Sequence, residues 1–420
     1  MPPPTLIEIV PLNSLPGVPI TVPGSKSVTN RALILAAMAR GPVTLHGALW
    51  SEDTQVMTAA LRQLGIAIDV FPDLSEPCNR EIRVHGRGGE LAPGGSEEHP
   101  TELFVGNAGT AARFLASWVC LGRGAYRLSG VPRMHERPQA ELFRSLRELG
   151  YRVDSPNDKL PALIHGAGPR DAICRVSLAD SSQFASSLLL TAPLGGWRVQ
   201  VGDLNADEAP YVAMTEKLVQ IFPFQGGEFQ VEPDASSGSY FWGAGGSVAH
   251  WPQSGWQIDA EFPKFLPLPP KISRRTDLGD SIMTAIVLAP FSEHPVTFND
   301  LGRLRVQECE RVAALRTELE KCGARVQESG DSLTVFPSRL HGAEIETYDD
   351  HRMAMCFGML GLRVGGIRIH NPSCVKKTFP NFFAKLAAPP PYGWGADIWR
   401  IAPSTRTRME PLAADGLVFA

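Results

Sequence analysis

Cationic and hydroxyl side chains recur at the predicted starts of helices along this chain. The first case is PGSKSVTNRALILAA, residues 23–37, in which Ser25 or Ser27 is a natural N-cap and Lys26 stands in the first turn. A cation there is unfavourable for the helix dipole unless an anion lies beside it. Lys26, the free N–H groups and the dipole would together bind a phosphate or carboxylate. A solvated lysine beside an ordinary helix start would explain the same sequence.

Three further segments of the first half have a similar character. In LFVGNAGTAARFL (103–115) small residues join a strand to a helix, so a ligand can approach the backbone, although neither a Walker loop nor GxGxxG is present. VPRMHERP (131–138) carries Arg133 and Arg137, whose forked guanidinium groups suit carboxylate or phosphate. DSSQFASSLLL (180–190) places hydroxyls at the start of an apolar helix. Solvated arginines and a routine serine N-cap are the structural alternatives.

The second half adds acids to the bases at such positions. They are Asp280 in GDSIMTAIVLA, Glu308 and Arg311 in RLRVQECERVAAL, Asp350, His351 and Arg352 in YDDHRMAMC, and Lys377 in VKKTFPNFF. Glu308 and Arg311 are three residues apart, which predicts a shared face on a helix over 306–323. Any one cluster could be a salt-bridged surface turn. Together they predict helix starts that converge on a multiply anionic ligand pair.

Length and composition indicate an ordinary globular protein. The 420 residues suffice for two domains, and 43% are hydrophobic and 20% charged. A net charge of −4 argues against a nucleic-acid-binding face. Seven cysteines without a CxxC pair indicate reduced thiols and no zinc site. Since no signal peptide or membrane-spanning stretch is recognisable, we expect a cytoplasmic protein that binds neither nucleic acid nor membrane.

The predicted elements alternate between short strands and amphipathic helices. AALRQLGIAIDV (59–70), RSLRELGYRVDS (144–155) and RTELEKCGARVQE (316–328) each read as a helix closed by glycine and followed by a strand. These copies predict an α/β (α+β) protein built from a repeated unit, although such junctions are common in any α/β protein. Irregular structure is expected over 87–101 and 242–279. The tail after 388 reads as an appendage.

The ordered motifs identify a family. PGSKSVTNRALILAA, LFVGNAGTAARFL, PRMHERP, SSQF, DASSGSYF, DSIMT, YDDHRMAMC and KTFPNFF closely resemble the 5-enolpyruvylshikimate-3-phosphate synthase family over about residues 15–388. The resemblance implies enolpyruvyl transfer from phosphoenolpyruvate to the 5-hydroxyl of shikimate 3-phosphate, with no metal or organic cofactor. We expect a monomer, although no feature of the sequence specifies the oligomeric state. The resemblance also implies a two-domain inside-out barrel of repeated βαβαββ units, divided into 22–236, 1–21 plus 237–388, and a tail at 389–420.

The resemblance also assigns residues. Phosphoenolpyruvate would contact Lys26, Gly109, Arg137, Gln183, Arg311, Arg352 and Lys377. Shikimate 3-phosphate would contact Lys26, Ser27, Arg31, Ser181, Ser182, Gln183 and Asp280. Asn107, Thr110, Tyr211 and His351 complete the expected substrate-binding set. Asp280 would take the acceptor's hydroxyl proton, while Lys26 and Glu308 manage proton delivery and removal. The step at which each acts is left open.

Several positions depart from the family pattern. Gln307 replaces a lysine, Arg303-Leu304 an Asn-Trp pair, and Asp207 and Glu208 stand where a serine would help to hold the shikimate phosphate. The 240–280 segment lacks a convincing helix and an expected Gln-Gly-Asp-like stretch, which predicts one degraded repeat in the C-terminal domain. Two alternatives follow: a transferase for a different cyclic hydroxy-acid, or a non-catalytic anion-binding homologue. A related family that uses a UDP-sugar carries a cysteine in the loop matching 131–138, which is absent here.

Overall fold

The chain has a mixed α/β fold with two compact units. A computed structural model describes residues 3–179, 181–202, 209–402 and 404–419. One unit comprises Gly24–Glu232 and the other Met1–Pro23 together with Pro233–Ala420. The division expected from the sequence, 22–236, encloses the first of these within a few residues at each end. Within the described residues, every helix is too short or too polar to span a bilayer.

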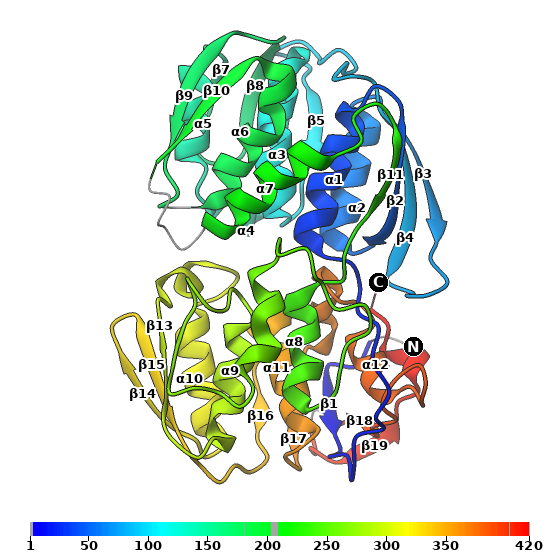
Figure 1. Cartoon of the computed structure of the whole chain (residues 1–420), viewed down its shortest axis with the longest axis vertical. Coiled ribbons are helices and arrows are strands. Elements are labelled where there is room, and N and C mark those ends of the chain that lie inside the picture. Colours follow the sequence, from blue (N-terminus) through cyan, green and yellow to red (C-terminus); the bar gives the residue numbers. More distant parts are fainter. Residues whose placement is uncertain (1–2, 180, 203–208, 403, 420) are drawn as a thin grey trace. The chain divides into compact units, whose positions relative to one another are not determined.

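The described residues of the unit 24–232 form three sheets, ordered β11-β2-β4-β3, β5-β6-β8-β7 and β10-β9 (Figure 1). Its strands are β2 (Pro42–Leu49), β3 (Ala67–Pro72), β4 (Asn79–His85), β5 (Thr101–Phe104), β6 (Arg123–Ser129), β7 (Arg152–Asp154), β8 (Ala162–Ala167), β9 (Ala172–Val176), β10 (Trp197–Val201) and β11 (Gly227–Gln230). Its helices are α1 (Lys26–Met38), α2 (Glu52–Gln63), α3 (Gly109–Trp118), α4 (Pro132–Glu136), α5 (Ala140–Glu148), α6 (Ser182–Gly195) and α7 (Ala209–Ile221).

In the described part of the other unit there are two sheets, ordered β12-β13-β15-β14 and β16-β17-β1-β18-β19 (Figure 1). Its strands are β1 (Leu6–Ile9), β12 (Lys271–Ser273), β13 (Val296–Asn299), β14 (Arg325–Ser329), β15 (Ser332–Phe336), β16 (Glu344–Ile345), β17 (Ile367–His370), β18 (Ile398–Ile401) and β19 (Arg408–Pro411). Its α-helices are α8 (Ala235–Ala244), α9 (Ile282–Leu288), α10 (Arg311–Lys321), α11 (His351–Gly361) and α12 (Phe382–Ala387).

All three four-stranded sheets within the described residues share one pattern. In each, the first two strands of the order are parallel and the following pairs are antiparallel. The edge strands β3, β7 and β14 each follow a helix that ends at a glycine: Gly65, Gly150 and Gly323 all have φ +88°. This left-handed conformation is easy only for glycine, so the predicted glycine caps are confirmed.

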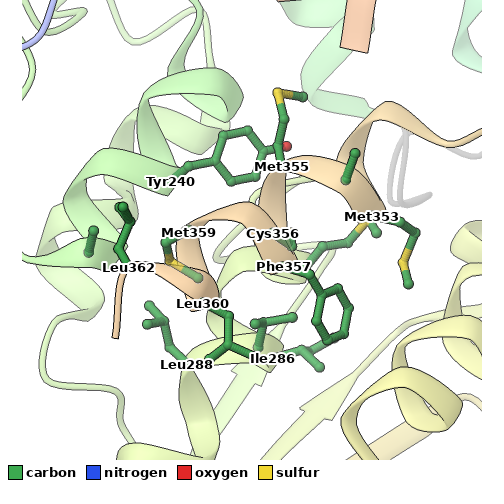
Figure 2. Close-up of a cluster of buried hydrophobic side chains, with 14 of the residues drawn as sticks. Tyr240, Ile286, Leu288, Met353, Met355, Cys356, Phe357, Met359, Leu360 and Leu362 are labelled. Carbon is green, nitrogen blue, oxygen red and sulfur yellow. The ribbon is translucent and has the colours of Figure 1, made fainter. Parts of the chain in front are cut away.

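The core of the second unit surrounds α11. Figure 2 shows Tyr240 of α8, Ile286 of α9, and Phe357 and Met359 of α11 within one buried cluster. Every residue of α11 from Met353 to its end is buried. Because a closely packed interior compresses very little, this core holds the N-terminus of α11, which bears His351 and Arg352, in place.

The C-terminal segment 389–420 is not an appendage, contrary to the expectation from its sequence. β18 pairs antiparallel with β1, and β19 pairs with β18. Arg408 of β19 binds the buried carboxylate of Glu8 with its Nη2 at 2.5 Å, and Trp394 packs edge-on against Phe241 at 5.0 Å between ring centroids. The segment is therefore part of the sheet and core. The sequence of this segment did not predict its place in the sheet, because β18 pairs with a strand that lies almost 400 residues away at the other end of the chain.

The segment between α8 and β12 is irregular, as expected. Residues 245–270 contain a 3₁₀ helix at Ile258–Phe265 and an isolated bridge between Ile20 and Val248. Trp251 of this segment packs edge-on against Trp242 of α8, with 5.8 Å between the ring centroids. Two side chains of this segment, Gln257 and Asp259, nevertheless reach the starts of neighbouring helices.

Candidate functional site

Lys26 begins α1, as the sequence predicts, and Ser25 is its N-cap. The Nζ of Lys26 lies 3.2 Å from Oδ2 of Asp53, a buried carboxylate in the first turn of α2. Asp53 therefore offsets the cation that the dipole of α1 disfavours. Sequence reasoning missed Asp53, although an acid in the first turn of a predicted helix is a recognisable feature.

Arg31 ties α1 to two other helices of its unit. Its guanidinium donates to Thr215 Oγ1 at 2.7 Å, to Ser186 Oγ at 2.9 Å and to the carbonyl of Ser27 at 2.9 Å. The carbonyl of Tyr211 accepts a longer bond of 3.4 Å from the same group. Arg31 is buried, so these bonds brace α1, α6 and α7, and its contact with a substrate stays a prediction.

Asn107, Gly109 and Arg137 lie together at the start of α3. Arg137 ends α4 and donates to the carbonyl of Asn107 at 3.2 Å. A Cβ added to Gly109 would lie 2.6 Å from Nη2 of Arg137, so a larger residue could not stand here without moving that arginine. Arg133, by contrast, is exposed and pairs with Glu136.

The start of α6 lies next to that of α3. The Nε2 of Gln183 donates to Thr110 Oγ1 at 3.4 Å, while Ser181 caps α6 by accepting from the N–H of Gln183 at 3.2 Å. Ser182 is the first, buried residue of the helix. The sequence-predicted hydroxyls and amide of these two segments therefore share one end of the α3–α6 pair.

Asp280 is held between two arginines in the second unit. Arg274 Nη2 lies 3.2 Å from Oδ1, and Arg352 Nη2 lies 3.1 Å from Oδ2. Burial disfavours the charged carboxyl, but the charges of Arg352, Arg274 and Arg311 outweigh it and hold the pKa of Asp280 well below its ordinary value. Asp280 is therefore ionised. Arg274 was not among the residues that the sequence suggested.

A second charged cluster joins Glu308, Arg311 and Lys377. Glu308 accepts from Arg311 Nη2 at 2.9 Å and from Lys377 Nζ at 3.0 Å. Arg311 also donates from Nε to Oδ2 of the buried Asp350 at 2.7 Å. Asp350 in turn caps α11 by accepting from the N–H of Arg352 at 2.8 Å. His351 is buried as the first residue of that helix.

One predicted boundary in this cluster is wrong. The helix expected over 306–323 begins only at Arg311, because 302–306 form a 3₁₀ turn and Gln307 adopts φ −90° and ψ −134°. Glu308 therefore does not share a helical face with Arg311. Their ion pair forms instead across the turn that precedes the helix.

The residues that depart from the family pattern have different surroundings. Gln307 Oε1 accepts from Arg311 Nη1, so this residue adds a bond to the arginine rather than a second cation. Arg303 lies half-buried in the 3₁₀ turn. Asp207 and Glu208 lie outside the described residues.

Two further residues that the sequence reasoning passed over are Gln257 and Asp259. Gln257 Oε1 accepts from the N–H of Ala235, the first residue of α8, at 2.9 Å. Asp259 accepts from the N–H of Ser281 at 2.8 Å and from Ser236 Oγ at 2.6 Å. Burial and the nearby Asp280 charge raise the pKa of Asp259. The sequence Gln257-Ile258-Asp259 could have indicated both residues, because it places two polar side chains close together in a segment otherwise predicted to be a degraded repeat.

Comparison with known proteins gives consistent results across the chain. The family model described as EPSP synthase (3-phosphoshikimate 1-carboxyvinyltransferase) matches residues 13–225 and 263–386. The 3-phosphoshikimate 1-carboxyvinyltransferase of Trichormus variabilis is 34% identical over 90% of this chain and 98% of its own length. That of Aeromonas salmonicida is 36% identical over 91% and 98%.

Solved structures show the same fold. EPSP synthase from Acinetobacter baumannii has a TM-score of 0.75 at 22% identity, covering 94% of this chain and 99% of its own. The enolpyruvyl transferase NikO from Streptomyces tendae has a TM-score of 0.66 at 18% identity, with coverage of 94% and 99%.

Proposed function

The chain belongs to the EPSP synthase family, and on that premise we infer that it transfers the enolpyruvyl group of phosphoenolpyruvate to the 5-hydroxyl of shikimate 3-phosphate, releasing phosphate. This is a step of aromatic amino-acid biosynthesis. The observation that carries the inference is identity of 34–36% to curated transferases of this activity over about nine-tenths of the chain. No cofactor is part of the proposal.

We propose that the two clusters of cations serve this one pair of substrates. Phosphoenolpyruvate and shikimate 3-phosphate each carry a phosphate and a carboxylate, which need several cations for neutralisation. Lys26 and Arg137 would supply two from the unit 24–232, and Arg311, Arg352 and Lys377 three from the other. Lys26, Arg311 and Arg352 lie in the first turns of α1, α10 and α11, beside free backbone donors, which supports this proposal. Arg137 and Lys377 stand instead at the C-terminal ends of α4 and of a 3₁₀ turn, so they would contribute through their side-chain charges alone.

The hydrogen-bonding side chains have a matching proposed role. Shikimate 3-phosphate would contact Ser27, Arg31, Ser181, Ser182 and Gln183, and phosphoenolpyruvate would contact Gly109 and Gln183. The remaining residues of the proposed substrate-binding set are Asn107, Thr110, Tyr211 and His351. The missing side chain of Gly109 supports the proposed role of Arg137, because a Cβ there would lie 2.6 Å from Nη2 of that arginine and displace it.

Asp280 is the proposed base. The reaction removes the proton of the acceptor hydroxyl and adds one to the methylene carbon of phosphoenolpyruvate, and it reverses these transfers when phosphate leaves. Only an ionised carboxylate can accept a proton, and Arg352 and Arg274 keep Asp280 ionised. Lys26 and Glu308 would handle the methylene proton. Glu308 is held by Lys377 and Arg311, which a substrate anion would draw away.

The finer architecture is proposed on the same basis. The three four-stranded sheets, which share one pattern of parallel and antiparallel pairs, support repeats of a βαβαββ unit within a two-domain inside-out barrel. The irregular residues 245–270 would be a repeat that has lost its helix and strands. We also propose a monomer in the cytoplasm that binds no nucleic acid. The free thiols of all seven cysteines suit a reducing compartment.

Phosphate release in the presence of both substrates tests the activity. Release with phosphoenolpyruvate and shikimate 3-phosphate, absent when either is omitted, is the expected result. Release with shikimate but not with its 3-phosphate would assign a different acceptor. Calorimetric binding of both substrates without release would contradict the enzymatic proposal.

A further inference from the structure

The two oxygens of Asp280 are held by arginines from different elements. Arg274, directly after β12, contacts Oδ1, and Arg352, in the first turn of α11, contacts Oδ2. The side chain of Arg274 is 1% exposed, whereas that of Arg352 is 13% exposed. Arg352 can therefore meet a ligand anion from solvent, while Arg274 remains enclosed against Asp280.

The backbone beside Asp280 is fixed from a third side. The N–H of Ser281 donates to Oδ1 of Asp259 at 2.8 Å, and Asp259 is itself tied to Ser236 in the first turn of α8. With its main chain held by Asp259 and one oxygen held by Arg274, Asp280 keeps its orientation when Arg352 leaves. Such support around a reacting group determines how accurately the group is placed.

We propose that Arg274 is a positioning residue for the transfer reaction. It stays on Oδ1 of Asp280 and leaves Oδ2 to the acceptor hydroxyl once the phosphoenolpyruvate anion has drawn Arg352 away. This inference rests on the proposed function. Without Arg274, Asp280 would depend on Arg352 for its neutralising charge, and phosphoenolpyruvate would have to compete with the full carboxylate for that arginine.

The proton transfer then balances. The acceptor O–H bond breaks as its proton joins Oδ2, the hydroxyl oxygen bonds to the central carbon of phosphoenolpyruvate, and the methylene carbon takes up one proton. When phosphate leaves, the methyl group gives up a proton and the double bond forms again. No group is oxidised or reduced. Arg274 remains protonated throughout and acts only through Asp280.

The charged groups that face Asp280 define the expected pH dependence. Arg352, Arg274 and Arg311 stabilise its charge, and Glu308 and Asp259 oppose it. Removing Arg274 takes away one stabilising charge, so the acidic limb of the kcat/KM profile should move to higher pH. A residue that served stability alone would leave that limb in place.

The matched variants are Arg274→Met, Arg274→Lys and Arg275→Met. Arg275 is the neighbouring residue but is half-exposed and pairs with Asp300 at 3.1 Å, whereas Arg274 pairs with Asp280. For the full-length chain we expect Arg274→Met to raise the phosphoenolpyruvate Kd, measured by calorimetry, by about tenfold, the size of one lost charge contact. Its kcat should also fall. Arg274→Lys should keep the Kd within about threefold but lower kcat, since an ammonium lacks the fixed fork.

The outcomes separate this inference from the proposed function. An unchanged Kd, kcat and acidic limb in folded Arg274→Met, or the same changes in Arg275→Met, would overturn it. If Arg274→Met does not fold, unchanged kcat in Arg274→Lys would overturn it as well. If the unaltered chain binds phosphoenolpyruvate but releases no phosphate, the proposed function fails, while the Kd comparison still decides whether Arg274 acts through Asp280 and Arg352.

Discussion

The two units hold the cations that are proposed to bind substrate in different ways. In the unit 24–232, Arg31 and Arg137 donate to hydroxyl and carbonyl oxygens, and Lys26 pairs with one carboxylate, Asp53. In the other unit carboxylates hold the cations: Asp280 holds Arg274 and Arg352, Glu308 holds Lys377, and Glu308 and Asp350 hold Arg311.

This difference has an electrostatic consequence. Neutral oxygen partners orient an arginine but leave its positive charge in place, so the first unit keeps a net attraction for anions. Carboxylate partners neutralise the cation until another anion competes for it. The second unit is therefore expected to respond to the ligand, releasing Asp280 and Glu308 when its cations turn to the substrates.

The largest expected effect is on activity in the first unit. Lys26→Ala should lower turnover by about a thousandfold, the usual range for losing a group that both binds charge and moves a proton. The measurement is phosphate release with both substrates. Lys264→Ala, at an exposed lysine that pairs only locally with Glu261, is the control and should keep full activity. Undiminished turnover in Lys26→Ala would contradict the site assignment.

The second effect contrasts the stability of the two clusters. Asp350→Ala leaves the buried Arg311 without its closest carboxylate, which should lower the free energy of unfolding by about 3–5 kcal/mol. Asp53→Ala leaves the partly exposed Lys26 without its carboxylate partner, which should lower the free energy of unfolding by about 1 kcal/mol or less. Urea unfolding of both variants measures the contrast. Equal losses of unfolding free energy would mean that Asp350 contributes no more to stability than Asp53 does.

A third prediction concerns two neighbouring acids of opposite pH behaviour. Arg352, Arg274 and Arg311 overcome burial and lower the pKa of Asp280, so its stabilising contribution is complete above about pH 4 and is lost as the pH falls. Burial and the Asp280 charge raise the pKa of Asp259, so its contribution decreases as the pH rises above about 4.

Isosteric variants test these signs. Thermal unfolding between pH 4 and 8 should show that Asp259→Asn is more stable relative to the unaltered chain at pH 8 than at pH 4. Asp280→Asn leaves Arg274 and Arg352 without their carboxylate, so its destabilisation should be constant above about pH 4 and should diminish only at lower pH. Parallel pH curves for the two variants would contradict the assignment of opposite shifts.

The smallest effect compares equivalent positions across the units. Gly65→Ala, Gly150→Ala and Gly323→Ala should each lower the free energy of unfolding by about 1 kcal/mol, because alanine strains at φ +88°. Gly168→Ala, also at positive φ but with open space around it, separates backbone strain from crowding. A loss at Gly150→Ala far above that at Gly168→Ala would indicate crowding against Arg170 rather than strain.

The sequence alone determined the local features of this protein. Helix starts at Lys26, Gly109 and Ser182 could be predicted because capping residues and apolar periodicity are read within a few residues of one another. Ordered motifs also identified the family. The glycines at the ends of α2, α5 and α10 could also be predicted from neighbouring residues, since a residue in the left-handed conformation commonly ends a helix that leads directly into a strand.

Only the tertiary structure decided which groups meet. Several contacts join residues that lie apart in the sequence, and no local pattern specifies such partners. They are the ion pair of Lys26 with Asp53, the contacts of Arg274 and Asp259 around Asp280, and the pairing of β18 with β1. The late start of α10 was also settled by contacts, because the turn before it bends to form the ion pairs of Glu308. Local propensity determines where elements begin, but long-range packing determines the charge that each side chain experiences.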